Sequence, residues 1–259
     1  MNFREALIST YRQNPCQVLP NALWKALARL EQLQTSVRIE NGAAQRLAAF
    51  DEKRLLVYWT RDRGERLDFN RPLAELELAL IHQDYLHAVS QTAHFPVQKP
   101  YLRLIYCGSN QPTRVSVPAG FSLKAVKMPQ EAEQVAGLIG RCYRDLQPSA
   151  ATVVSWTRQP VFDPALWLWV VDEVQGNPVG LGIADIARDL GEGSLEWIQV
   201  LPDYRGRGLG RCIVLALLAR LKQRTAFITV AGLAGDRTDP EALYRRCGFT
   251  GSDVWWLLS

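Results

Sequence analysis

Residues 200–210 read Val-Leu-Pro-Asp-Tyr-Arg-Gly-Arg-Gly-Leu-Gly, and this stretch decides the fold class. It follows an apolar segment at 195–200 that predicts a buried strand, and it leads into 206–222, where apolar residues recur at helical spacing. A further apolar segment at 226–231 predicts a second strand. A strand, a crossover with a helix and another strand form a βαβ unit, so we expect these two strands to be parallel neighbours.

The loop within this stretch has the features of an anion site. Three glycines alternate along it: Gly206, Gly208 and Gly210. Without Cβ atoms the backbone can approach a ligand closely, and the N–H groups and helix dipole converge where the helix begins. Positive charge comes from Arg205, Arg207 and Arg211. We therefore expect the loop to bind phosphate; the alternative is a tight turn with solvated arginines.

Two nucleotide-binding motifs do not fit the loop. A Walker loop ends in Gly-Lys-Ser or Gly-Lys-Thr, and that ending is absent. A dinucleotide-binding G-x-G-x-x-G requires a third glycine at position 211 or 213, where the chain has Arg211 and Ile213.

The loop resembles the pyrophosphate loop of the GNAT superfamily of acyl-CoA-dependent N-acyltransferases. The family pattern is Arg or Gln, two residues, Gly, one residue, and Gly or Ala; residues 205–210 match it and follow Val-x-Pro-x-Tyr at 200–204. A second segment, ALYRRCGF at 242–249, resembles the family's closing A-L-Y-x-x-x-G-F. Together with the expected order of strands and helices, the resemblance covers residues 121–259.

The resemblance implies that acetyl-CoA, or another acyl-CoA, is the co-substrate. The residues implied to bind its pyrophosphate are Arg205, Gly206, Arg207, Gly208, Leu209, Gly210 and Arg211. The backbone of Ile198, Gln199 and Val200 is implied to pair with the pantetheine arm like an added strand, with one N–H polarising the acyl carbonyl. Donors of this kind stabilise developing negative charge by ~3–4 kcal/mol each.

The resemblance also places a catalytic acid at Tyr244, whose hydroxyl would protonate the departing CoA thiolate. The reference pKa of tyrosine is about 10, so the group is protonated at neutral pH. Anchoring of the thiol and ordinary aromatic packing are the alternatives for this residue.

For the general base we select Glu196, the one carboxylate in the apolar segment 195–200. A lone acid in a central strand is costly to bury unless it is used, as a base or as the anchor of a water chain. Exposure to solvent and pairing with an arginine are the alternatives, and Asp185 is a second candidate. Strand alternation predicts two faces: Glu196, Ile198 and Val200 on one, and Leu195, Trp197 and Gln199 on the other.

We therefore predict an N-acetyltransferase that moves an acetyl group from acetyl-CoA to a primary amine by direct attack in a ternary complex. The alternative is a non-catalytic acyl-CoA sensor or scaffold protein. We assign acceptor recognition to Ser149–Pro164 and the N-terminal half, which carry no motif, and we favour a small-molecule amine over a protein. Trp167 and Trp169 could line an acceptor groove, although core packing is the favoured interpretation.

For the whole chain we expect an α/β (α+β) protein with a GNAT-like mixed, mostly antiparallel sheet flanked by helices. Turn and breaker residues concentrate at 108–120, so we predict an N-terminal α/β domain at 1–115 and a GNAT-like catalytic domain at 116–259. In the N-terminal half we expect two helices, a three-strand meander, a third helix and a strand. Their ranges are 2–13, 21–34, 37–40, 46–50, 54–60, 72–92 and 101–107.

The N-terminal half lacks the phosphate loop, because 61–71 contains a single glycine. A degenerate copy of the same fold that has lost cofactor binding and an unrelated α/β cap both fit this pattern. Its function would be to cover the acceptor side of the catalytic domain or to form a homodimer.

Composition indicates a cytoplasmic protein that binds neither nucleic acid nor a membrane. The chain has 30 Lys and Arg against 26 Asp and Glu, a formal net charge of +4 that is too small to suggest wholesale phosphate neutralisation. No apolar run approaches the ~18 residues of a membrane helix, and the N-terminus lacks a signal core. The 5 cysteines are dispersed and lie apart from the 3 histidines, so we expect reduced thiols and no metal site.

Overall fold

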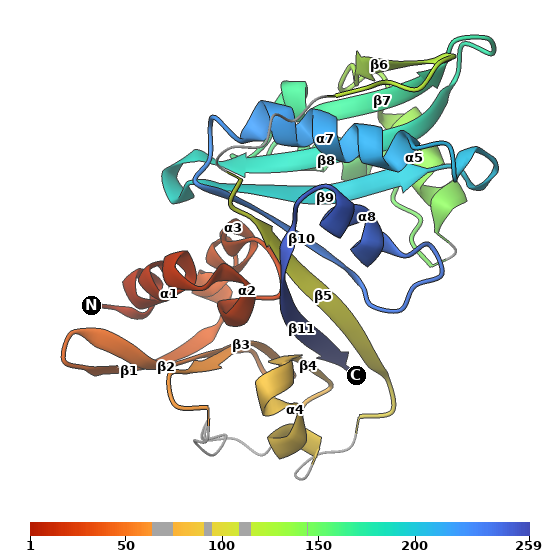
Figure 1. The fold of residues 1–259 in the computed structure, drawn as a ribbon. Helices are drawn as coiled ribbons and strands as arrows, with labels where there is room; N and C mark the ends of the chain where they lie inside the picture. The colour runs from red at the N-terminus through yellow and green to blue at the C-terminus, as the bar shows by residue number, and fades with distance from the viewer. Residues whose placement is uncertain (64–74, 91–94, 109–114, 144) are drawn as a thin grey trace. The chain divides into compact units, whose positions relative to one another are not determined.

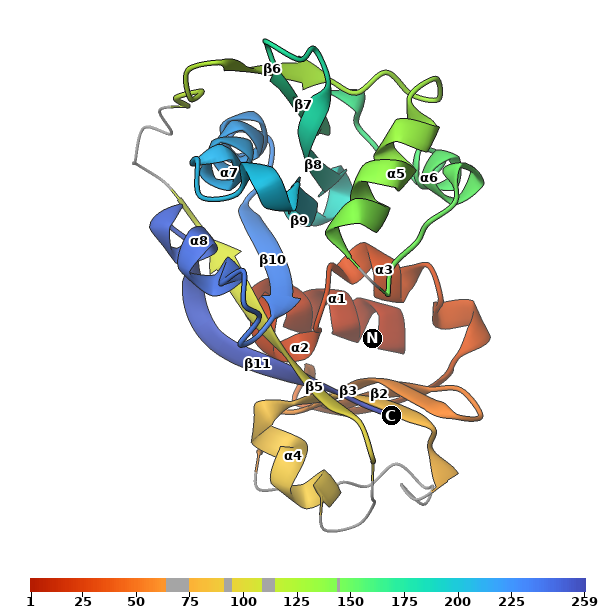
Figure 2. The same ribbon diagram turned by 90° about the vertical axis from the view of Figure 1, so that its right-hand side faces the viewer.

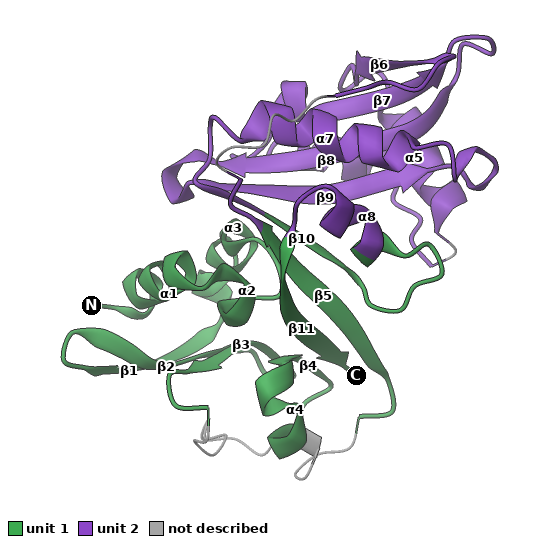
Figure 3. Cartoon of the chain, viewed as in Figure 1, with its two compact units in different colours: residues 1–105, 229–241, 250–259 green, residues 106–228, 242–249 purple. Residues whose placement is uncertain are grey.

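The computed structural model describes residues 1–63, 75–90, 95–108, 115–143 and 145–259. The chain forms two compact units (Figure 3). Unit 1 comprises Met1–Ile105, Thr229–Glu241 and Thr250–Ser259, and unit 2 comprises Tyr106–Ile228 and Ala242–Phe249. The units are interleaved along the chain, and the sequence boundary between 115 and 116 stays a prediction.

Unit 2 contains an antiparallel sheet in the order β6-β7-β8-β9. Its strands are β6 (Phe121–Ala125), β7 (Trp167–Asp172), β8 (Pro178–Ala187) and β9 (Glu192–Val200). Strand β10 (Phe227–Leu233), which begins in this unit, is the next neighbour of β9. The Ala226 N–H donates to the Gly191 carbonyl oxygen, so β9 and β10 begin at the same edge, as the βαβ prediction requires.

Helices cover both faces of this sheet. They are α5 (Ala132–Cys142), α6 (Ala150–Trp156) and α7 (Leu209–Leu221), and a further helix, α8 (Pro240–Arg246), precedes the last strand. Short 3-10 helices are η3 (Pro164–Leu166), η4 (Arg188–Leu190) and η5 (Pro202–Tyr204). Figure 2 shows α7 on one side of β8 and β9, with α5 and α6 on the other. The expected mixed, mostly antiparallel sheet flanked by helices is confirmed.

Close packing of α7 on β8 and β9 depends on glycines in these strands. A Cβ atom added at Gly182 of β8 would overlap the Ile213 side chain of α7. At Gly193 of β9 an added Cβ would lie 3.1 Å from Leu221 Cδ2. The helix that follows the predicted phosphate loop therefore rests directly on the sheet backbone.

We expect Gly182→Ala to lower the free energy of unfolding by ~1–3 kcal/mol, because the added methyl group overpacks the contact between α7 and β8. Urea denaturation measures this change. Gly137→Ala in α5 is the matched control, since an added Cβ there has no atom within 4 Å and alanine is favoured over glycine inside a helix. Equal unfolding midpoints for Gly182→Ala and the wild type would contradict the role assigned to Gly182.

In unit 1 the strand order is β1-β2-β3-β4-β11-β5, with the later residues of β10 beyond β5. The strands are β1 (Gln34–Glu40), β2 (Ala43–Phe50), β3 (Arg54–Thr60), β4 (Leu78–His82), β5 (Gln98–Tyr106) and β11 (Thr250–Leu258). Strands β1 to β3 form the predicted antiparallel meander. Asn41 and Gly42 adopt φ values of 50° and 75°, as the hairpin turn between β1 and β2 requires.

The helices of unit 1 are α1 (Phe3–Gln13), α2 (Pro15–Val18), α3 (Leu23–Leu27) and α4 (Gln83–Ser90). In Figure 1, α1 and α2 lie on one side of the sheet and α4 on the other. The prediction for α1 is confirmed, and Asn2 caps this helix together with Glu5.

Two predicted helices of the N-terminal half are wrong in extent. The predicted helix at 21–34 is reduced to α3 and the 3-10 helix η1 (Leu30–Gln32), because β1 begins at Gln34. The predicted helix at 72–92 is replaced by β4 and the shorter α4; residues 72–74 and 91–92 lie outside the described part of the chain. Strand β4 forms because it pairs with both β3 and β11, and this pairing outweighs the helical spacing of its leucines.

The last strand of the chain, β11, belongs to the core of unit 1. Trp255 and Leu258 are buried, and the Trp255 indole N–H donates to the Cys16 carbonyl oxygen at 2.7 Å. Asp253 Oδ1 lies 3.1 Å from Nε2 of the buried His82, whose Nδ1 lies 3.1 Å from Asp84 Oδ2. The C-terminal strand therefore completes a sheet made mainly of N-terminal strands.

Candidate functional site

The predicted phosphate loop has the expected strand-to-helix geometry. Strand β9 ends at Val200, and α7 begins after Gly208. Gly208 occupies the N-cap position with left-handed backbone (φ 78°, ψ 2°), and no side chain caps the helix. Gly206 also has a positive φ, 77°. Residues 205–208 are exposed, and the first turn of α7 carries no acidic side chain.

Backbone donors at this helix start have no acceptor within the helix. Cys212 is the first residue whose N–H bonds inside α7, to the Gly208 carbonyl oxygen at 3.0 Å. The N–H groups of Leu209, Gly210 and Arg211 precede it and belong to the unpaired first turn. An exposed, uncapped helix start of this kind can bind an anion.

The arginines of the loop surround this helix start. Arg205 Nε donates to the Val200 carbonyl oxygen at 3.1 Å, which ties the loop back to the end of β9. Arg207 lies over the Tyr204 ring, 5.0 Å from its centroid, and donates to the Asp203 carbonyl oxygen. Arg211 extends from the first turn of α7 and is exposed. All three guanidinium groups belong to one short segment, so together they concentrate positive charge around the helix start.

Tyr204 anchors the loop to the sheet. Its ring packs edge-on against Phe121 of β6, with centroids 6.2 Å apart, and its hydroxyl donates to the Asp172 carboxylate at the end of β7. The N–H groups of Gln175 and Val174 also donate to Asp172, and these bonds hold the pKa of its carboxyl below the ordinary value. The tyrosine of the V-x-P-x-Y segment thus has a structural role.

A β-bulge at Glu196 changes the predicted faces of β9. Ile183 pairs with Trp197 and Ala184 pairs with Leu195, so Glu196 is the extra residue between them. The prediction that Leu195 shares a face with Trp197 and Gln199 is therefore wrong. Leu195 pairs opposite Ala184, on the α7 face, and Ile198 pairs opposite Gly182 on the same face.

Glu196 lies on the α5 and α6 face, with Ser194 and Trp197, and not with Ile198 and Val200 as alternation predicted. Ser194 Oγ donates to Glu196 Oε1 at 2.7 Å, and Ser194 pairs opposite Asp185 of β8. The two candidate bases therefore lie on neighbouring strands of one face. The strand also begins earlier than predicted, at Glu192, which is a second, buried carboxylate in β9.

The second motif, ALYRRCGF at 242–249, forms the C-terminal end of α8. The Gly248 N–H donates to the Arg245 carbonyl oxygen and the Phe249 N–H to the Tyr244 carbonyl oxygen, which is the Schellman pattern. Gly248 has φ 95°, and the Tyr244 and Phe249 rings meet edge-on at 5.7 Å. The spacing Tyr-x-x-x-Gly-Phe therefore fixes the position of the Tyr244 ring.

Tyr244 is buried, and this burial raises the pKa of its phenol above the ordinary value; the nearby Tyr143 and Cys247 add to the rise. Tyr143 follows α5, is 41% exposed and accepts a hydrogen bond from Gln199 Nε2 at 2.9 Å. Sequence reasoning missed Tyr143 and Ser194. Ser194 could have been selected from the sequence, because it lies two residues before Glu196, next to the predicted strand at 195–200. No motif in the sequence marks Tyr143.

The Cys247, Trp167 and Trp169 side chains near the site are buried. All 5 cysteines are free, and burial raises the pKa of the Cys247 thiol to about 11, partly opposed by Arg211 and Arg246. This thiol is thus protonated at neutral pH and is a poor nucleophile.

Trp167 and Trp169 are both buried, which confirms core packing, and the Trp169 indole N–H donates to Glu131 at 2.8 Å.

The sequence model of the Acetyltransferase (GNAT) family matches residues 133–249, which include β9, the loop and Tyr244. The C-terminal half of this chain contains a GNAT acetyltransferase domain. A comparison with curated protein sequences finds no match.

Solved structures share the fold over most of the chain. A GCN5-related N-acetyltransferase from Sphaerobacter thermophilus has a TM-score of 0.70 at 17% identity, over 98% of this chain and 90% of that one. A GNAT-family acetyltransferase from Colwellia psychrerythraea has a TM-score of 0.63 at 10% identity, over 100% and 97%. A tandem GNAT protein from the clavulanic acid biosynthesis pathway has a TM-score of 0.57 at 15% identity, over 88% and 82%. The likeness to this tandem protein spans both halves of the chain.

The residues of the GNAT domain fit an acyl-CoA pyrophosphate. The loop residues predicted for this role, 205–211, are contiguous around an uncapped helix start that has three arginines and no acidic side chain in its first turn. Within the described ranges, no group of three or more His, Cys, Asp or Glu side chains is arranged to hold a metal ion. No helix in the described part of the chain is long and apolar enough to cross a membrane.

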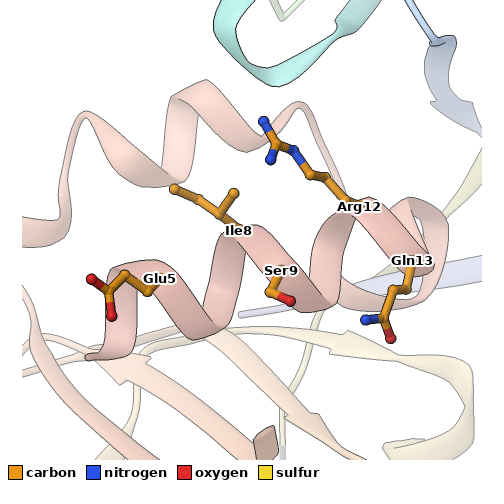
Figure 4. A pocket seen from close by; sticks show the side chains of 5 residues that line it. All are labelled: Glu5, Ile8, Ser9, Arg12 and Gln13. Atoms are coloured by element: carbon orange, nitrogen blue, oxygen red, sulfur yellow. The ribbon is translucent and has the colours of Figure 1, made fainter. Parts of the chain in front are cut away.

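A surface hollow lies along α1 in unit 1. It has a volume of about 490 Å³ and is lined by Glu5, Ile8, Ser9, Arg12 and Gln13. Figure 4 shows these side chains extending from successive turns of α1 without converging on one point. The hollow therefore presents no candidate site.

Proposed function

We propose that the GNAT domain transfers an acetyl group from acetyl-CoA to a primary amine of a small molecule, by direct attack in a ternary complex. The observation that carries the proposal is the uncapped start of α7, where Gly206 and Gly208 hold left-handed backbone. This geometry leaves the first N–H groups of the helix available to the pyrophosphate.

The binding roles follow from the loop and from β9. Residues 205–211 bind the pyrophosphate, and the backbone of Ile198, Gln199 and Val200 pairs with the pantetheine arm. When bound, acetyl-CoA supplies an activated thioester. The side chain of Gln199 turns toward α5, where it binds Tyr143, so the backbone groups of β9 rather than this side chain face the cofactor in the proposal.

The proton transfers are assigned to two side chains of the domain. Glu196 accepts a proton from the ammonium group of the acceptor, directly or through water, and the neutral amine that results attacks the thioester carbonyl. The Ser194 hydroxyl keeps the Glu196 carboxylate oriented. Tyr244 donates a proton to the departing thiolate, and its burial keeps the phenol protonated for that step. The second proton, which the nitrogen loses as the amide forms, passes through water and restores the phenol.

The proposal is tested by binding and by turnover. Calorimetry with CoA and with acetyl-CoA measures binding, and release of free CoA thiol across a panel of primary amines measures turnover. We expect both ligands to bind and at least one amine to be acetylated. Failure of both ligands to bind at millimolar concentration would show that the loop assignment is wrong. Binding without turnover of any amine would favour a sensor or scaffold.

We expect Glu196→Gln to lower turnover by ~10²- to 10⁴-fold at neutral pH, with partial recovery as the pH rises. Glutamine cannot accept a proton, and the fraction of neutral amine in solution increases as the pH approaches the pKa of the amine. Rate profiles over pH for Glu196→Gln and for Asp185→Asn measure the effect. A loss in Asp185→Asn with full activity in Glu196→Gln would assign the role to Asp185.

A further inference from the structure

Five aromatic rings form a row on the α5 and α6 face of the unit 2 sheet. This aromatic row consists of Tyr143, Trp197, Trp156, Trp167 and Phe162, and the centroids of successive rings are separated by 6.1, 5.5, 6.4 and 5.5 Å. Trp156 and Trp197 stack with planes 17° apart. The row begins at the surface, where Tyr143 is 41% exposed, and passes through two half-buried tryptophans to Trp167, which is 1% exposed. It ends at Phe162, which is half-buried.

The exposed end of the row is held in place from within the domain. Gln199, which is buried, donates to the Tyr143 hydroxyl at 2.9 Å. The buried Trp167 ring packs against Trp156, the last residue of α6, and this helix is capped by Ser149. A preorganised aromatic surface binds a ligand with little loss of side-chain entropy.

A carboxylate lies next to this surface. The bulge in β9 turns Glu196 onto the same face as the adjacent Trp197, and the Ser194 hydroxyl binds one of its oxygens at 2.7 Å. The same face therefore presents partly exposed indole rings and, one residue away, a negative charge. This combination is complementary to a molecule with an apolar ring and a nearby ammonium group.

We propose that the acceptor is a primary amine joined through a short chain to a planar apolar ring. The ring packs against Trp156 and Trp197, and the amino group points toward Glu196. This inference rests on the proposed function, since it names the class of acceptor for the same site. The two tryptophans are specificity residues and take no part in proton transfer.

The first measurement compares two amines that differ in the ring. We expect kcat/KM for 2-phenylethylamine to exceed that for n-propylamine by ~10- to 100-fold, the effect of burying one phenyl ring. Equal values, or faster reaction of n-propylamine or of an alkyl diamine, would overturn the inference. Calorimetry of the same amines with the CoA-saturated protein measures the preference as binding, independently of turnover.

The second measurement tests whether the aromatic row causes the preference for 2-phenylethylamine over n-propylamine. Trp156→Leu should reduce the ratio between the two amines about tenfold, and Tyr143→Leu, at the exposed end, should also reduce it. Trp256→Leu is the matched control, because Trp256 is a partly buried tryptophan on β11 of unit 1, and the ratio should not change. Unchanged ratios in both row variants would overturn the inference.

The two measurements separate this inference from the proposed function. If no amine is acetylated but 2-phenylethylamine binds with an affinity that depends on Trp156, the proposed function fails, and the aromatic row binds the ring-bearing amine as a ligand and not as an acceptor. If amines are acetylated without preference for a ring, the proposed function holds and the inference fails.

Discussion

Replacement of Tyr244 by phenylalanine is expected to lower turnover by ~10²- to 10⁴-fold while the affinity for CoA changes little. The substitution removes the hydroxyl that donates a proton to the thiolate. It keeps the ring, which packs edge-on against Phe249 and belongs to the Schellman end of α8. The fold should therefore be preserved, and the loss should appear in kcat.

The pH dependence provides a second test of the same role. Burial raises the pKa of Tyr244, so its neutral, donating form persists through the usual titration range of tyrosine, near pH 10. The wild-type rate should therefore not decline between about pH 8 and 10 through loss of this proton. Steady-state rates and CoA calorimetry measure both effects.

Tyr143→Phe is the matched control for Tyr244→Phe, because it removes the neighbouring hydroxyl and also keeps a ring. Full activity of Tyr244→Phe at every pH would make this tyrosine a packing residue. A large loss of kcat in Tyr143→Phe alone would assign the proton donor to Tyr143.

The two motifs could be located from the sequence because each encodes a local backbone geometry. Gly208 begins α7 and Gly248 ends α8, and both require positive φ, which glycine adopts without strain. The residues that make each turn lie within a few positions of one another. The order of strands in the C-terminal half was predictable for the same reason, because its elements follow one another as a meander and a βαβ unit.

The errors have non-local causes. Strict alternation of side chains along a strand cannot predict a β-bulge, and no residue type at 195–197 marks Glu196 as the extra residue. The spacing of the leucines before His82 suits a helix, but β11, whose residues follow position 249, pairs with β4 and makes it a strand. The contact between Tyr143 and Gln199 likewise joins a helix end and a strand that are 56 residues apart.

Gly208→Val is expected to abolish CoA binding at millimolar concentration while the fold is retained. Gly208 has φ 78°, a conformation that a β-branched residue adopts only with strain. An added Cβ would lie 3.9 Å from Pro118 Cγ, an ordinary contact, so the rest of the protein has room for it. The damage is therefore confined to the loop, where the backbone must turn its N–H groups toward the pyrophosphate.

Gly210→Ala provides the matched control for Gly208→Val. Gly210 lies in the first turn of α7, and an added Cβ there would be 3.4 Å from Leu243 Cδ2, within ordinary contact. The family pattern accepts Gly or Ala at this position, so we expect CoA affinity within about tenfold of the wild type, a difference of at most about 1.4 kcal/mol. Calorimetry measures affinity, and circular dichroism with thermal unfolding checks the fold. A folded Gly208→Val protein that binds CoA as tightly as Gly210→Ala does would refute the loop assignment. Tight binding would mean that the strain and bulk of valine at position 208 do not affect the CoA site, so the loop backbone at this position could not bind the pyrophosphate.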